Sequence, residues 1–219
     1  MKIFLTGFQR SGTTLLRHVI RNHPEIRRIF HEDCLLAKGI DWLKNTVNFD
    51  IDKLHWGEKL PWYGLRPRKS YNGTIIDYCA EWNLLFPDSK IIQIIRHPAD
   101  VMLSNYSTFK IPQDKCYEVM NRCFKKVIPH IDSFVNCLTI KFEDLVVNPV
   151  ETLMGVYEFL EIDNSIETVV KITRHDQYRL DGISKSRAYA HLKEGIRIHK
   201  KYDFTEINTL LNQYDGEQY

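Results

Sequence analysis

Residues 2–17, KIFLTGFQRSGTTLLR, join a short apolar run to a glycine-bounded loop and then to the start of an amphipathic segment. Gly7 and Gly12 are separated by four residues, which is the spacing of the phosphate-binding loop G-x-x-x-x-G-K-[ST], whose backbone N–H groups surround phosphate oxygens. Thr13 stands where that loop has its lysine, and Arg10 supplies a cation inside the loop instead. The stretch therefore predicts an anion site that differs from that of a P-loop nucleoside triphosphatase in the position and type of its cation.

The segment after this loop predicts a helix over residues 13–22, because its apolar residues recur on one face: Leu15, Leu16, Val19 and Ile20. Residues 2–6 before the loop suit a buried strand. A helix that starts directly after such a loop offers unpaired N–H groups and a positive dipole end to an anion. The order of strand, loop and helix is the context that a phosphate loop requires.

A second unit of the same kind follows. Residues 75–86 predict a helix, and residues 90–96, KIIQIIR, are the clearest strand in the chain. The sequence HPADVMLSNY then predicts a helix with Pro98 in its first turn, where the missing N–H costs nothing. Arg96 and Ser104 are thus expected at the carboxyl end of a strand and on the next helix, the edge of a parallel sheet at which ligands bind.

The rest of the chain continues the alternation. We expect a long helix over residues 114–135, kinked or broken at Pro129, a strand over 137–145 and a helix over about 150–160. Glu143 and Asp144, at the end of that strand, are interpreted as residues that cap and orient the following helix. The fold class is α/β, a P-loop-NTPase-like three-layer fold with a central, mainly parallel sheet flanked by helices.

Composition bounds the domain organisation and the partners. The 219 residues, 43% hydrophobic and 26% charged, fit a single domain over 1–219, with a core at 1–160 and a helical and loop-rich part at 161–219. A net charge of +2 does not favour nucleic-acid binding. The sequence shows no leader and no long apolar run, so we expect a cytoplasmic protein without stable membrane insertion.

The cysteines number five, and their spacing matches no metal site. Several of them lie among apolar residues, so we expect buried free thiols in a reducing compartment and no metal cofactor.

Five motifs together resemble one family, and they follow its order: GFQRSGTTLLR with HPEI, WGEKLPWY, LFPDSKIIQIIRHPADVMLSNY, IKFEDLVVNP and FLEI. The chain resembles the sulfotransferases that use 3′-phosphoadenosine 5′-phosphosulfate (PAPS), in the branch with tyrosylprotein and bacterial carbohydrate or small-molecule sulfotransferases. The resemblance covers about residues 1–160. It implies transfer of a sulfuryl group from PAPS, with 3′-phosphoadenosine 5′-phosphate (PAP) as product and no metal.

The resemblance also implies which residues hold the donor. The 5′-phosphosulfate would contact the loop residues Arg10, Ser11, Gly12, Thr13 and Thr14. The 3′-phosphate would contact Arg96 and Ser104. In the segment DGISKSR, Ser184, Lys185 and Arg187 match a loop that covers the nucleotide.

Catalysis by such a site requires a base that takes the acceptor's proton and a cation that stabilises the developing charge. The resemblance assigns the base to Glu32, with the flanking His31 and Asp33 as alternatives; HED could also cap the next helix. It assigns the cation to Lys59, in what is interpreted as a loop, and a further cationic role to Arg10. Leu60 departs from the threonine that is usual after this lysine.

Two other classes of function remain open from the sequence. A P-loop kinase would need the lysine that Thr13 replaces, and a non-catalytic module would bind PAP and PAPS alike. For the sulfotransferase, the acceptor is expected to be a hydroxyl-bearing small molecule, carbohydrate or lipid. The sequence does not define the oligomeric state.

Overall fold

The computed structural model describes residues 1–31, 35–38, 55–64, 66–67, 71–175, 202–205, 209 and 212–213. Within these residues the strands are β1 (Lys2–Phe8), β2 (Ile26–His31), β3 (His55–Tyr63), β4 (Arg66–Pro67), β5 (Lys90–Ile95) and β6 (Cys137–Lys141). The helices are α1 (Thr13–Arg21), α2 (Leu35–Lys38), α4 (Ile75–Leu85), α5 (Pro98–Phe109), α6 (Gln113–Asp132), α7 (Phe142–Val147), α8 (Pro149–Phe159) and α9 (Ile166–His175).

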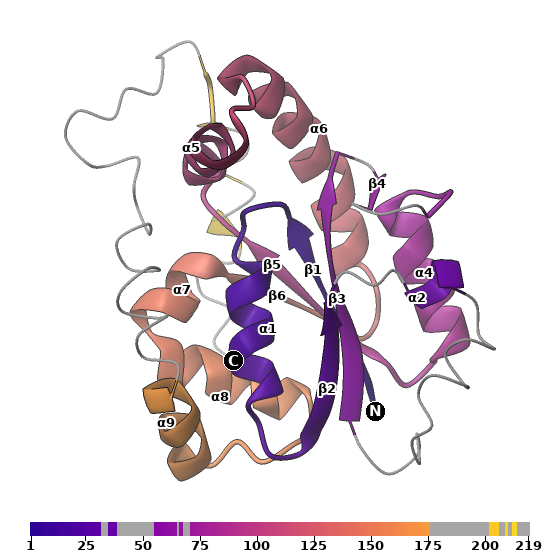
Figure 1. Ribbon diagram of the computed structural model, residues 1–219, viewed down its shortest axis with the longest axis vertical. Coiled ribbons are helices and arrows are strands. Elements are labelled where there is room, and N and C mark those ends of the chain that lie inside the picture. The colour runs from indigo at the N-terminus through magenta and orange to yellow at the C-terminus, as the bar shows by residue number, and fades with distance from the viewer. Residues whose placement is uncertain are drawn as a thin grey trace.

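The strands form one sheet in the order β2-β3-β1-β5-β6, with every neighbouring pair parallel. The short β4 adds an antiparallel partner to the end of β3. β1 lies at the centre, so its apolar residues are buried from Ile3 to Phe8. Helices cover both faces of the sheet, and the α/β, P-loop-like class expected from the sequence is confirmed (Figure 1).

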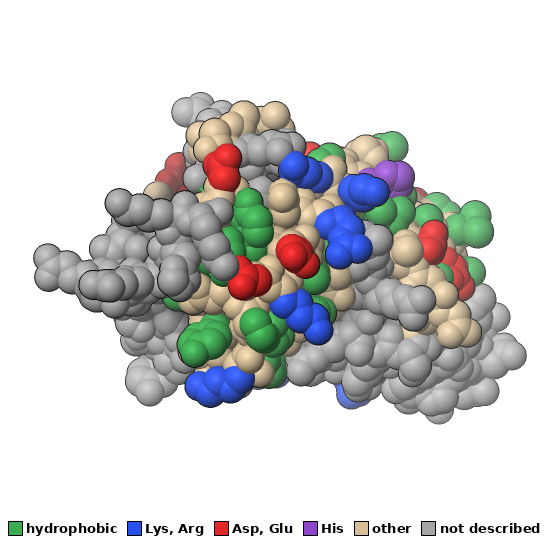
Figure 2. Space-filling view, turned by 90° about the horizontal axis from the view of Figure 1, so that it is seen from above, with side chains coloured by type: hydrophobic (Ala, Val, Ile, Leu, Met, Phe, Trp, Pro, Cys, Tyr) green, Lys and Arg blue, Asp and Glu red, His purple; other side chains and the backbone are tan. Residues whose placement is uncertain are grey.

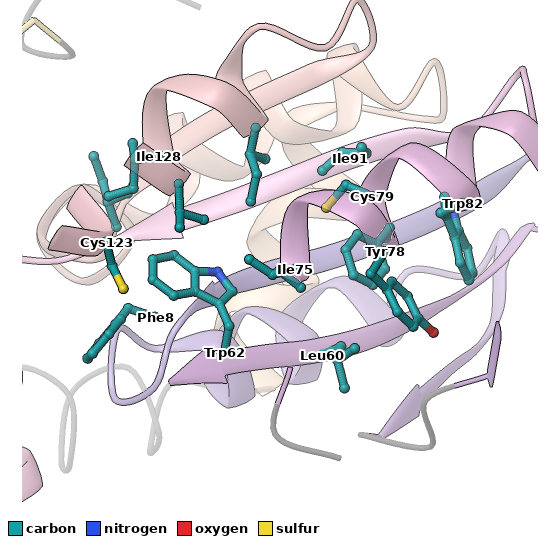
Figure 3. Close-up of a cluster of buried hydrophobic side chains, with 14 of the residues drawn as sticks. Phe8, Leu60, Trp62, Ile75, Tyr78, Cys79, Trp82, Ile91, Cys123 and Ile128 are labelled. Carbon is teal, nitrogen blue, oxygen red and sulfur yellow. The ribbon is translucent and has the colours of Figure 1, made fainter. Parts of the chain in front are cut away.

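Each face of the sheet has its own hydrophobic cluster, because successive strand residues point to opposite faces. One cluster joins Phe4 and Phe8 of β1 to α4 and α6, with Trp62, Tyr78 and Trp82 among its largest members (Figure 3). The other joins Ile3 and Leu5 to α1, α7, α8 and α9. The alternation along β1 therefore sets the three-layer architecture.

Local sequence signals explain several element boundaries. Thr74 and Asp77 form a reciprocal capping box at the start of α4. Pro98 occupies the first turn of α5, as expected. α6 continues through Pro129 to Asp132, so the expected break there is wrong, although the helix ends three residues after the proline.

Two expectations about the strands need correction. The expected strand over 137–145 ends at Lys141, because Phe142 already begins α7. The stretch WGEKLPWY is part of the buried strand β3 rather than a loop. Pro61 is accommodated in this strand because it lies beyond His31 and Lys59, the last residues at which β2 pairs with β3.

The four cysteines in the described residues are free, as expected, and Cys34 lies outside them. Burial raises the pKa of the Cys116, Cys123 and Cys137 thiols to about 12, and raises that of Cys79 well above its usual value. A thiol with such a pKa holds almost no thiolate at neutral pH, and the thiolate is the reactive form.

We therefore predict that these four thiols resist alkylation by iodoacetamide in the native protein at pH 8. Peptide mass spectrometry should show their modification only after denaturation. Rapid modification of Cys116 or Cys123 in the native protein would contradict the burial described here.

Candidate functional site

The loop between β1 and α1 presents backbone N–H groups and a hydroxyl at the carboxyl edge of the sheet. α1 begins at Thr13, after Gly12 in the left-handed conformation (φ 100°), and no side-chain hydrogen bond caps it within the described residues. The Ser11 hydroxyl is buried and has no hydrogen-bond partner in the described part of the chain. Buried polar atoms need a partner, so this loop suits an anion that supplies acceptor oxygens.

Arg96, the residue after β5, reaches across to this loop. Its side chain is only 4% exposed, and Nη1 donates a hydrogen bond of 3.2 Å to the backbone carbonyl of Arg10. The guanidinium lies 4.4 Å from the centre of the Phe142 ring at the start of α7. A cation is thus held in a buried position beside the loop by partners from two other segments.

Arg10 completes a cluster of predicted site residues. Its Nε donates a hydrogen bond of 2.9 Å to the Ser104 hydroxyl of α5. Arg10 itself has a positive φ of 76°, which is unfavourable for a residue with a side chain and is typical of strained functional loops. The structure brings Arg10, Arg96 and Ser104 together from sequence separations of 86 and 94 residues.

Lys59 of β3 is a second buried cation next to the loop, on the side opposite β5. Its side chain is fully buried, and Nζ donates a hydrogen bond of 3.3 Å to the Thr14 hydroxyl in the first turn of α1. Because Lys59 lies on a strand beside β1, where it pairs with Leu5, its position is set by the sheet. A lysine from the neighbouring strand therefore reaches the loop whose own lysine is missing.

Two acidic residues near the site were not identified as such from the sequence. The N-cap residues of α7 and α8 are Lys141 and Asn148, so Glu143 is not the N-cap of either helix. Its carboxylate accepts a hydrogen bond from its own N–H in the first turn of α7, and its Oε1 accepts one of 3.0 Å from the His97 N–H. Burial raises the pKa of the Glu143 carboxyl, and these two N–H groups and Arg96 partly offset that effect.

Glu58, the residue before Lys59, is the second of these acids and faces the opposite side of the sheet. Its carboxylate accepts hydrogen bonds from the Leu35 N–H at 3.1 and 3.2 Å and from the Tyr78 hydroxyl at 2.5 Å. Leu35 is the first residue of α2. A capping acid usually lies close in sequence to its helix, so no sequence signal linked Glu58 to α2.

Several predicted site residues lie outside the described part of the chain: Glu32, Asp33, Ser184, Lys185 and Arg187. The backbone of His31 ends β2 and pairs with Lys59. The stretch with the candidate base therefore starts beside the buried lysine.

A C-terminal segment returns to the same edge of the sheet. Tyr117 of α6 donates a hydrogen bond of 2.6 Å to the Asp203 carbonyl. The Phe204 ring lies 6.3 Å from the His97 ring, centre to centre. Seen from above, the surface at this end of the molecule mixes several Lys and Arg side chains with acidic and apolar ones (Figure 2).

The described residues contain no group of three or more His, Cys, Asp or Glu side chains that could hold a metal ion. None of their helices is long and apolar enough to cross a membrane.

The fold and the loop define an α/β protein of the P-loop-like class, in which Lys59 of β3 and Arg96 after β5 reach the loop between β1 and α1. The sulfotransferase domain model matches residues 1–206, and the chain belongs to that family. A putative protein-tyrosine sulfotransferase of Caenorhabditis briggsae is 26% identical over 190 residues, 74% of this chain. The chain spans 66% of the length of that relative.

Solved structures share the fold at low sequence identity. A sulfotransferase domain from the Synechococcus PCC 7002 olefin synthase has a TM-score of 0.69 at 16% identity, covering 99% of this chain and 95% of its own. The mouse sulfotransferase SULT7A1, solved in complex with PAP, has a TM-score of 0.60 at 15% identity, covering 99% and 84%.

Gly12 provides a test of the loop geometry. A Cβ at Gly12 would lie 2.3 Å from the Phe142 ring that packs on Arg96. We predict that Gly12→Ala lowers the free energy of unfolding by about 2–5 kcal/mol, the sum of the positive φ and the overlap. Chemical denaturation measures this change.

Gly64→Ala is the matched control, since Gly64 also has a positive φ (73°) but a Cβ there would meet only Val119 Cγ1, at 3.7 Å. It should cost about 1–2 kcal/mol, the backbone contribution alone. Equal losses in the two variants would show that Phe142 does not fill the space above Gly12.

Proposed function

We propose that this protein transfers the sulfuryl group of PAPS to a hydroxyl group of a small-molecule, carbohydrate or lipid acceptor. The observation that carries the proposal is the cluster of Arg10, Arg96 and Ser104 beside the loop. A loop for one phosphate next to a second cationic site suits a nucleotide with phosphates at two separate positions. PAP, the ligand of the mouse relative's structure, is such a nucleotide.

The residues of the loop fit the group that PAPS would place there. The buried Ser11 hydroxyl has no hydrogen-bond partner in the described residues, and the start of α1 adds N–H groups. When bound, PAPS supplies a sulfuryl group activated by its 5′-phosphate. We assign Ser11, Gly12, Thr13 and Thr14 to that phosphate.

The second phosphate of the nucleotide, at the 3′ position, is assigned to Arg96 and Ser104, which belong to the cluster beside the loop. Arg10 belongs to the loop and its side chain reaches Ser104, so its guanidinium can bind oxygens of either phosphate. The resemblance adds Ser184, Lys185 and Arg187 as further contacts to the nucleotide.

For the transfer itself, the chain must accept a proton and stabilise negative charge. A bond forms between the acceptor oxygen and sulfur as the bond between sulfur and the 5′-phosphate oxygen breaks, and that oxygen keeps the electron pair. Lys59, buried beside Thr14, stabilises this charge. Glu32 takes the hydroxyl proton, with Asp33 and His31 as the alternatives.

The acceptor and the compartment are extensions of the same proposal. The described residues hold four free cysteines, three of them buried, which supports a reducing compartment, so we propose a cytoplasmic reaction. A tyrosine-containing peptide belongs in the acceptor screen because the worm relative is named a protein-tyrosine sulfotransferase. We favour carbohydrate, lipid or small-molecule hydroxyls over it.

The donor assignment predicts that the protein binds PAP more tightly than adenosine 5′-phosphate or ATP–Mg²⁺ in calorimetric titrations under one buffer. Arg96→Ala should weaken PAP binding by about 2–4 kcal/mol, since it strips a buried cation from a phosphate. Adenosine 5′-phosphate, which lacks the 3′-phosphate, should be affected little.

The control variant for this experiment is Arg122→Ala, because Arg122 is exposed on α6. It should leave all three affinities unchanged. A preference of the wild-type protein for ATP–Mg²⁺ would favour a kinase and contradict the proposal.

The catalytic assignment predicts a different pattern. Lys59→Met and Glu32→Ala should each lower turnover by roughly 10²-fold or more while changing PAP affinity only a few-fold, since both groups act on charges that develop during transfer. Transfer of ³⁵S from labelled PAPS to an acceptor found by screening measures this.

Exposed residues of α6 supply the controls: Lys126→Met and Glu118→Ala should retain full turnover. Full turnover of Glu32→Ala would exclude Glu32 as the base and leave Asp33 and His31. A fully active Lys59→Met would remove the stabilising role from Lys59.

A further inference from the structure

Glu143 is a buried carboxylate to which the proposed reaction gives no role. It is 7% exposed and lies in the first turn of α7. β5 and β6 are parallel neighbours, and their last paired residues are Ile95 and Lys141. The residues that follow these two strands, 96–97 and 142–143, therefore leave the sheet side by side.

Phe142 and Glu143 both contact the end of β5, each in its own way. The Phe142 ring packs 4.4 Å from the Arg96 guanidinium. The Glu143 Oε1 accepts the 3.0 Å hydrogen bond from the N–H of His97, the residue directly after Arg96. Phe142 thus contacts the Arg96 guanidinium, and Glu143 binds the backbone N–H of the residue that follows Arg96.

The same hydrogen bond also fixes α5. His97 is the N-cap of α5, and Pro98 follows it in the first turn. Ser104, two turns further along this helix, accepts the hydrogen bond from Arg10. An acceptor on the His97 N–H therefore constrains both Arg96 and the helix that carries Ser104.

Burial makes this carboxylate costly unless its contacts offset the loss of hydration. The N–H groups of His97 and of Glu143 itself and the charge of Arg96 favour the ionised form, whereas Asp100 opposes it. A residue needed only to fill space could be apolar at this position. A carboxyl group whose hydrogen bond reaches the residue after a buried arginine indicates a role tied to Arg96.

We propose that Glu143 is a positioning residue that holds Arg96 and the start of α5 in the geometry that receives the 3′-phosphate of the nucleotide. This inference rests on the proposed function, since it assumes that the arginine cluster binds that phosphate. It predicts a loss confined to the 3′-phosphate, which a general loss of folding would not produce.

The experiment compares PAP with adenosine 5′-phosphate by calorimetry for the wild-type protein and for Glu143→Ala. PAP binding should weaken about tenfold or more, because the His97 N–H loses its acceptor and Arg96 its neighbouring charge. The affinity for adenosine 5′-phosphate should stay within about twofold. Glu151→Ala, which removes an exposed carboxylate from the first turn of α8, should change neither affinity.

Two further variants keep the test decisive. Glu143→Asp keeps the carboxylate, but its side chain is one methylene too short to reach the His97 N–H, so this variant should also lose the preference for PAP. If Glu143→Ala does not fold, Glu143→Asp tests the positioning role in its place. In the Arg96→Ala background, Glu143→Ala should cost less PAP affinity than in the wild-type protein, because the part of its effect that acts through Arg96 is already lost.

The possible failures are distinguishable. A wild-type protein that binds PAP no better than adenosine 5′-phosphate would overturn the proposed function. A wild-type preference for PAP that Glu143→Ala and Glu143→Asp both retain would overturn the positioning role alone. An equal loss of PAP affinity with and without Arg96 would do the same.

Discussion

The hydrogen bond from Arg96 to the carbonyl of Arg10 is the constraint on which the site depends. β1 and β5 are parallel neighbours, and Gly7 pairs with Ile94, so both chains leave the sheet at the same edge. Without a link beyond the sheet, the loop after β1 would have to hold Arg10 at a positive φ unaided, at a cost of about 1–3 kcal/mol. The bond from Arg96 ties this peptide to the end of a rigid strand.

The same arrangement explains why the site suits an anion. Lys59 and Arg96 are both nearly or fully buried, and removing a charge from water costs several kcal/mol unless partners offset it, on the order of the penalty known for buried ions. Lys59 donates a hydrogen bond to the Thr14 hydroxyl, Arg96 donates one to the Arg10 carbonyl, and the Glu143 carboxylate acts on Arg96 through its charge. A phosphate or sulfonate bound beside these two cations would add negative charge, so we expect ligand binding to stabilise the folded protein.

The sequence predicted those parts of the structure that local patterns determine. β1, α1, β5 and α5 follow from apolar runs, glycines and a proline, and their order placed Arg96 and Ser104 at the sheet edge. The strand character of β3 was missed because Pro61 and the charged Glu58 and Lys59 resemble a loop. Those charges make hydrogen bonds with Leu35, Tyr78 and Thr14, which lie far away in the sequence. The contact between Glu143 and His97 is of the same long-range kind.

β3 connects the two faces of the sheet at the point where the chemistry is proposed. Neighbouring strand residues point to opposite faces, so Lys59 reaches the loop before α1 while Glu58 holds the first N–H of α2. β2 ends at His31, which pairs with Lys59, and α2 starts at Leu35, which is bound to Glu58. The chain is therefore fixed to two adjacent residues of β3 on either side of the stretch that contains Glu32 and Asp33. The resemblance could therefore limit the candidate base to residues 31–33 but not choose among them. The contacts on either side of this stretch are made with Lys59 and Glu58, which belong to a strand that the local sequence pattern did not reveal.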